Sequence, residues 1–191
     1  MGRKWRMVRT SVLVMALAVA ARGLWAQEST PRTILVFGPR LGVSAVLQEP
    51  GAFSSDMQKV TQDADRSFFP VFSEVGIGAG QFIPLGSSGT YITFQQAFLV
   101  GGLDQRMPLP SAFLTLGCRL PFGLEAGVGP YGTLTPLSGS AEFVLSMVYT
   151  AGWVFATPDF QVPITLMFVP IPGYLNPRIT LLFGINFWML R

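Results

Sequence analysis

The sequence predicts an all-β fold, a closed antiparallel up-and-down transmembrane barrel of about eight strands. Three observations support it: apolar residues alternate with small or polar ones in eight segments, the charges in those segments share one face, and long connectors alternate with short ones. A tilted strand of about ten residues crosses a membrane. The alternating segments are 38–48, 71–83, 91–101, 111–120, 124–133, 141–154, 160–169 and 178–189.

The charges within these segments all fall on the face opposite the large apolar residues. They are Arg40, Glu74, Arg119, Glu125, Glu142 and Arg178, three basic and three acidic. An apolar outer face suits hydrocarbon, where a charge costs about 2–4 kcal/mol at the midplane. Because hydrocarbon offers the backbone no hydrogen-bond partners, the sheet must close on itself. We therefore expect these six side chains to form an ion-pair network inside the lumen.

The connectors predict which end of the barrel faces outward. Long segments follow the first, third, fifth and seventh strands, at 49–70, 103–110, 133–140 and 170–177, and mostly shorter ones lie near 84–90, 121–123 and 155–159. Outer-membrane barrels carry long loops outside and short turns at the periplasmic rim, where both termini would lie. Within 49–70, the stretch Ser54–Arg66 has helical character. We expect a solvated loop there, with a lid or a cation site at Asp63 and Asp65 as the alternative.

The N-terminus has the pattern of a cleaved secretory signal peptide over residues 1–26, which leaves 27–191 as the barrel domain. Basic residues precede an apolar run at 11–21, and Leu24-Trp25-Ala26 ends in a small residue. The run is too short to span a bilayer, although an uncleaved anchor is an alternative. Removing 1–26 removes five of the 13 basic residues and no acid, so 8 basic and 10 acidic residues give a net charge of −2. No basic patch remains for nucleic acid.

The composition excludes most catalytic sites. The chain has no histidine and one cysteine, Cys118, so Ser-His-Asp, Cys-His and histidine-based zinc sites cannot form, nor can an intramolecular disulfide. The letters of 127–132 match G-x-G-x-x-G, but they open no helix. Glu125 with Glu142 could do acid–base work, although a structural ion-pair role is favoured. We expect no cofactor, no metal and no enzymatic activity, and we expect Cys118 on the apolar face.

Several stretches together resemble small bacterial outer-membrane β-barrel proteins: the signal peptide, the opening 38–42, the stretch 123–130 and the closing 178–187. The resemblance implies an outer-membrane location, contact with its lipid, and insertion by the outer-membrane assembly machinery, which reads an alternating last strand that ends on an aromatic. The matching residues are Ile179, Leu181, Phe183, Ile185 and Phe187, although this chain continues to Arg191. Barrel-shaped enzymes of that membrane generally use a catalytic histidine, so the resemblance implies no such chemistry.

Three functional hypotheses follow from these observations. The first is a non-enzymatic outer-membrane protein, either envelope-structural or in contact with a surface ligand or host through its outer loops, mainly 49–70. The second is a narrow pore for small solutes, because apolar residues such as Leu99 and Val148 also face inward. The third is a soluble periplasmic lipocalin-like barrel that binds a ligand. A polytopic helical protein is disfavoured because Gly and Pro interrupt the apolar runs.

Overall fold

The computed structural model describes residues 32–137, 140–170 and 177–190, so the predicted signal peptide lies outside the described residues. Besides the strands, it contains helix α2 (Pro50–Thr61) and a 3-10 turn, η1 (Leu103–Gln105). The strands are β1 (Ile34–Val46), β2 (Val71–Pro84), β3 (Tyr91–Gly101), β4 (Leu109–Arg119), β5 (Leu124–Leu137), β6 (Ser140–Ala156), β7 (Phe160–Val169), β8 (Arg178–Gly184) and β9 (Asn186–Leu190).

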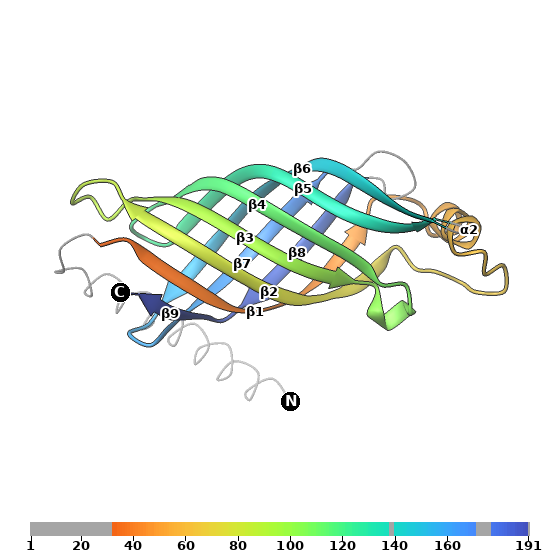
Figure 1. Ribbon diagram of the computed structural model, residues 1–191, viewed down its shortest axis with the longest axis horizontal. Coiled ribbons are helices and arrows are strands. Elements are labelled where there is room, and N and C mark those ends of the chain that lie inside the picture. The colour runs from red at the N-terminus through yellow and green to blue at the C-terminus, as the bar shows by residue number, and fades with distance from the viewer. Residues whose placement is uncertain (1–31, 138–139, 171–176, 191) are drawn as a thin grey trace, which may run out of the picture.

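The strands close into a barrel. Consecutive strands pair antiparallel from β1 to β8, and β1 pairs with β8 and β9 on its other side. Because β8 and β9 are one strand interrupted at Ile185, the barrel has eight strands in up-and-down order, as predicted (Figure 1). One connector differs from its prediction: β5 continues through Leu137 and β6 begins at Ser140, so most of 133–140 is strand.

The interruption at Ile185 has a local cause in the neighbouring strands. The Ile185 N–H donates to the Pro39 carbonyl at 3.3 Å, and the Ile185 carbonyl points at Gly38, where any Cβ would collide with it. On the other side, no pairing joins Val162 and Pro163 of β7 to Gly184 and Ile185, and Pro163 has no N–H to donate to a neighbouring strand. The break therefore lies between two positions that tolerate it.

Exposure alternates along the strands as a barrel with an apolar outer surface requires. In β4, for example, Leu114 and Leu116 are exposed whereas Phe113 and Thr115 are buried. Cys118 is exposed on the outward face, as expected. The outward apolar side chains come from all around the barrel, among them Phe37, Leu41, Ile77, Phe98, Leu145, Leu166, Phe183 and Phe187. None of the helices in the described residues is long and apolar enough to cross a membrane.

The two ends of the barrel differ in their connections. At one end, here called the loop end, lie α2 and η1; at the other, the turn end, lie the short connections 85–90, 120–123 and 157–159 (Figure 1). The described chain begins and ends at the turn end. Gly123 closes one of these turns at a φ of 94°, a backbone conformation that favours glycine.

Helix α2 differs from the solvated loop expected within 49–70. It begins at Pro50, which suits a first helical turn, and ends at Thr61, after which Gln62 adopts the left-handed conformation. Phe53 and Met57, four residues apart on one helix face, are 0% and 1% exposed. They belong to one contiguous cluster with apolar side chains of the barrel interior, so the helix is part of the core.

Candidate functional site

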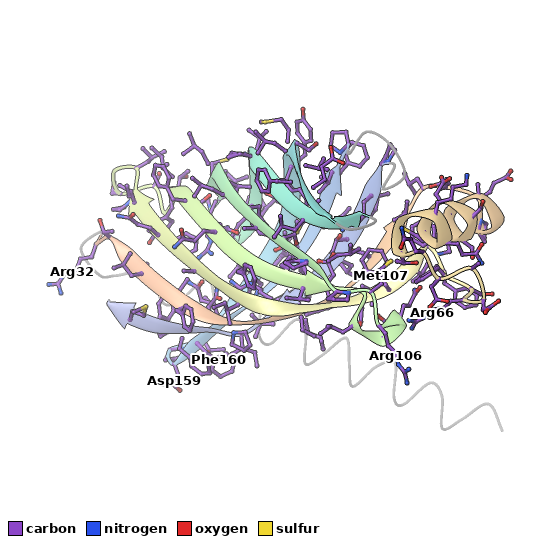
Figure 2. All side chains as sticks on the ribbon, turned by 45° about the vertical axis from the view of Figure 1, so that its right-hand side comes forward. Arg32, Arg66, Arg106, Met107, Asp159 and Phe160 are labelled. Atoms are coloured by element: carbon purple, nitrogen blue, oxygen red, sulfur yellow. The ribbon has the colours of Figure 1, made fainter. Side chains whose placement is uncertain are left out.

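The candidate site comprises the interior of the barrel and the segments at its loop end. Helix α2 lies at this end (Figure 2). Its Phe53 and Met57 are buried against the interior. The chain after the helix returns along it, because the Phe68 N–H donates to Ser54 Oγ at 3.1 Å and Gln58 Nε2 donates to the Arg66 carbonyl at 2.7 Å. These contacts fix residues 49–70 as a packed cap on the barrel.

The segment 102–108 fastens the end of this cap to the barrel. Gln105 accepts a hydrogen bond from the Phe69 N–H at 2.8 Å and donates to the Val71 carbonyl at 2.7 Å. Asp104 accepts from both the N–H and the hydroxyl of Ser73, at 3.1 and 2.9 Å. Arg106 extends away from the barrel, whereas the adjacent Met107 is buried (Figure 2). Two outer segments far apart in sequence thus form one ordered surface.

Below the cap lies a buried polar group, here called the loop-side cluster: Ser44, Glu74, Tyr131, Arg178 and Thr180. Ser44 Oγ donates to Glu74 Oε1 at 2.5 Å, which leaves the Thr180 hydroxyl to donate to Ser44. Arg178 Nη2 donates to the Tyr131 hydroxyl and lies 3.6 Å from Glu74 Oε1. Both charged side chains are 1% exposed, so the pair is cut off from solvent.

A second group, here called the turn-side cluster, comprises Phe82, Gln95, Arg119, Glu125 and Gln161. Arg119 of β4 lies directly opposite Glu125 of β5 and forms an ion pair with it. Arg119 Nη2 also donates a hydrogen bond to Gln161 Oε1 at 3.3 Å. Gln95 donates to the other oxygen of Glu125. The Arg119 guanidinium also lies over the Phe82 ring, 3.8 Å from its centroid. Five strands (β2, β3, β4, β5 and β7) thus meet in this cluster, because each supplies an inward residue at this level.

The structure divides the six charges expected in one lumen network. Glu74 pairs with Arg178, Arg119 pairs with Glu125, and Arg40 occupies a separate position near Gly78 and Gly184. Glu142 lies in β6 with an exposed side chain. The alternation along each strand predicts which face of the barrel a charged side chain lies on, but not which residue it pairs with. The uncharged partners were not predicted from the sequence, and their inward position in the alternation was the available signal: Ser44, Gln95, Tyr131, Gln161 and Thr180.

The acid–base alternative does not fit the register. Glu125 lies opposite Gly152 of β6, whereas Glu142 lies ten residues before Gly152 on the same strand. At about 3.3 Å per residue, roughly 33 Å separates the two levels. The two carboxylates therefore cannot act on one substrate group. Within the described ranges, no three metal-ligating side chains lie together.

Aromatic side chains gather on the outside near the turn end. The rings of Phe122 and Trp153 are 5.5 Å apart, and those of Trp153 and Phe155 are 6.4 Å apart. Phe160 lies at the same end of the barrel (Figure 2). Outer-membrane barrels carry such aromatic rings at the level of the lipid headgroups.

A closed eight-stranded antiparallel barrel with apolar side chains outside and a filled polar and apolar interior has the architecture of small outer-membrane β-barrels. Among solved structures, the chain is similar to Ail, the attachment invasion locus protein of Yersinia pestis, with 12% sequence identity and a TM-score of 0.51. A second structure, Ail in complex with the heparin analogue sucrose octasulfate, gives 12% and 0.52. Each match covers 84% of this chain and 100% of the Ail chain.

No protein-family model and no curated protein matches the chain. At 12% identity, the likeness to Ail concerns the fold. The predicted resemblance to small outer-membrane barrels is confirmed at that level.

Proposed function

We propose that this chain is a non-enzymatic outer-membrane protein that acts through its loop end, by contact with a surface ligand or a host. The observation that carries the proposal is the packed cap: α2 buries Phe53 and Met57 in the barrel while its other face stays exposed. Burial on one side gives the helix a fixed position. A surface that is already ordered binds a partner without the entropy cost of ordering a loop.

The filled interior supports surface contact over the conduit. Beneath the cap, Leu99, Val148 and Met167 are 0% exposed. They lie beside the loop-side cluster, since Met167 is opposite Thr180, and the turn-side cluster lies further along the lumen. Phe82, under the Arg119 guanidinium, is 1% exposed. Eight-stranded barrels are just wide enough for side chains to fill. We therefore expect planar-bilayer recordings of the refolded full chain to show no discrete openings.

The charge of the outer surface bears on the kind of ligand. In segments 47–70 and 102–108, five acidic residues outnumber three basic ones, a net charge of −2. They are Glu49, Asp56, Asp63, Asp65 and Asp104 against Lys59, Arg66 and Arg106. Ail has been solved with a heparin analogue, a polyanion. We expect this acidic surface to select a neutral or cationic partner, since a polyanion would be repelled.

Cells that display the full chain test the proposal. Lys59, Asp63 and Asp65 lie on the exposed part of the cap, and the triple variant Lys59→Ser/Asp63→Ser/Asp65→Ser changes this surface without touching Phe53 or Met57. We expect wild-type cells to adhere to host cells or matrix and the triple variant to lose most of this adhesion. The matched control is Ser87→Ala/Ser88→Ala at the turn end, which should adhere like the wild type.

Folding and location are read from the same cells. A faster-migrating band in unboiled outer-membrane samples would show that each variant forms the closed barrel. If wild-type cells do not adhere, the surface-contact hypothesis is rejected. A loss of envelope integrity in cells that lack the protein would then favour the envelope-structural role. A single band in the soluble periplasmic fraction would instead favour the lipocalin-like hypothesis.

A further inference from the structure

A small cavity lined by both polar and apolar side chains lies in the lumen next to the turn-side cluster. Its volume is about 20 Å³, and its polar lining includes Arg40, Gln95, Arg119, Glu125 and Asn186. A cavity of this size accommodates about one water molecule or one ion of similar size. It is therefore a place for one small occupant.

Arg40 lines this cavity, and the residues around its guanidinium leave space for it. A Cβ at Gly78 would lie 2.8 Å from Arg40 Nε, and one at Gly184 would lie 2.6 Å from Arg40 Nη1. Glycine at both positions therefore leaves room for the side chain. Arg40 Nη1 donates to the carbonyls of Gly38 and Pro39, at 3.4 and 3.0 Å. A guanidinium has five N–H donors in all, so Arg40 retains donors for another acceptor.

The charges around the cavity do not balance. The charged side chains that line it are Arg40, Arg119 and Glu125, which sum to +1. Glu125 forms an ion pair with Arg119, and Arg40 lines the same cavity, so two cations face one carboxylate. An uncompensated charge inside a protein is costly unless a counter-charge neutralises it. The missing charge is a single negative one.

Asn186 supplies a second, independent observation. It is 3% exposed and lines the cavity, and its Oδ1 has no hydrogen-bond partner among the described residues. An unpaired buried amide oxygen is rare and calls for an explanation. The two ends of an Asn amide are assigned from their surroundings, and the opposite orientation turns Nδ2–H toward the cavity as a donor. In that orientation both Asn186 and Arg40 offer N–H groups to one occupant.

We propose that the cavity binds one small monovalent anion, such as chloride, held by the Arg40 guanidinium and the Asn186 amide. The anion supplies the missing negative charge, and it gives the buried Asn186 amide a partner. A water molecule would meet the hydrogen-bonding needs but would leave the net charge of +1. The site does not depend on the surface function, because it lies inside the barrel.

Thermal unfolding of the refolded full chain in zwitterionic detergent tests the site. The midpoint would be compared in sodium chloride and in sodium gluconate at equal ionic strength, since gluconate is too large for the cavity. We expect a saturable rise in chloride of about 2–4 °C when chloride exceeds its dissociation constant roughly fivefold. Bromide should act as chloride does, and a bromide-soaked crystal should show one anomalous peak beside Arg40 and Asn186.

Two variants address the two halves of the proposal. Arg40→Met removes the unbalanced cation, and Asn186→Asp supplies a fixed negative charge in its place. Both should lose the chloride-dependent rise, and N186D should be the more stable of the two in gluconate. Lys59→Gln, on the exposed cap, is the matched control and should respond like the wild type.

N186D and the bromide peak keep the test independent of whether R40M folds. A wild-type midpoint that is the same in chloride and gluconate, together with no bromide peak, would show that water alone occupies the cavity and would overturn the proposal. An undiminished chloride effect in N186D would also overturn it, because the anion would then bind elsewhere.

Discussion

The two ion pairs of the interior have the same chemistry in different surroundings. Arg178 and Glu74 are both 1% exposed, whereas Arg119 and Glu125 are 9% and 8% exposed and border the small cavity. In the loop-side pair, Glu74 Oε2 and Arg178 Nε have no hydrogen-bond partner in the described part of the chain. Both pairs have further hydrogen-bond partners, Ser44 and Tyr131 on the loop side and Gln95 and Gln161 on the turn side, but the cavity borders the turn-side pair. The cost of breaking a pair should therefore depend on whether a water molecule can reach the group that is left.

The largest effect is expected from breaking the sealed pair. Arg178→Met leaves Glu74 as a buried charge with no cation nearby to neutralise it, at a cost of about 3–5 kcal/mol. Urea unfolding of the refolded chain in detergent measures it. The double variant Arg178→Met/Glu74→Leu removes both charges and should regain most of the loss. A cost of less than about 1 kcal/mol for R178M would mean that water reaches Glu74.

The turn-side pair should be less costly to break. Arg119→Met leaves Glu125 with its hydrogen bond from Gln95 and with the adjacent cavity, where a water molecule can bind the freed oxygen. We expect a loss of about 1–3 kcal/mol, the cost of an incompletely satisfied polar group. The same urea titration gives the value. Equal losses for R119M and R178M would refute the distinction between the two clusters.

The face of each charge could be predicted from the sequence, but its partner could not. Alternation with a period of two is a property of each strand alone, so the sequence is enough to predict that Glu74 and Arg178 face the lumen. Their pairing depends on the register that brings β1 between β2 and β8, where Glu74 lies opposite Gly42 and Arg178 opposite Val46. Register is set by closure of the whole barrel. Glu142 follows the same alternation, but it lies near the start of β6, and its side chain is exposed there.

The cap was missed because its signal is weak in the sequence. Among the α2 side chains whose burial the structure describes, Phe53 and Met57 mark the buried face, in a segment rich in charge. Glu49, the residue that precedes the first turn of the helix, makes no side-chain capping bond. Twelve residues are too few for a stable isolated helix. Packing on the barrel end supplies the rest, and that surface exists only once the strands have closed.

We expect the cap to separate the loop-side cluster from water, and a double-mutant cycle tests this role. Phe53→Ala/Met57→Ala removes the side chains that hold α2 on the barrel. If water then reaches Glu74, R178M should cost about 1–2 kcal/mol less in this background than in the wild type, a coupling typical of interacting sites. R119M should cost the same in both backgrounds. Additive losses for R178M would assign the sealing to the barrel wall instead.

The smallest effect is expected from an uncharged polar side chain on the outer face, which contacts hydrocarbon instead of the polar groups of the lumen. Gln96 is exposed at the middle of β3, between Ala79 of β2 and Leu114 of β4, and points away from the interior. An amide that faces hydrocarbon loses its hydrogen bonds with water, so Gln96→Leu should stabilise the barrel by about 1 kcal/mol in lipid vesicles.

Gln81→Leu is the matched control for Gln96→Leu. Gln81 is also exposed on the outward face, but it lies three residues from the end of β2, close to the turn end. The cost of a polar group on the lipid face falls toward the interface, so the gain from Q81L should be the smaller one. This difference in stabilisation depends on depth in a bilayer. Both stabilisations should therefore decrease when the protein is transferred from vesicles to an amphipathic polymer that covers the outer face evenly. Equal gains at the two positions in vesicles would mean that β3 does not cross the membrane at its middle, and a loss in Q96L would mean that the amide has a polar partner there.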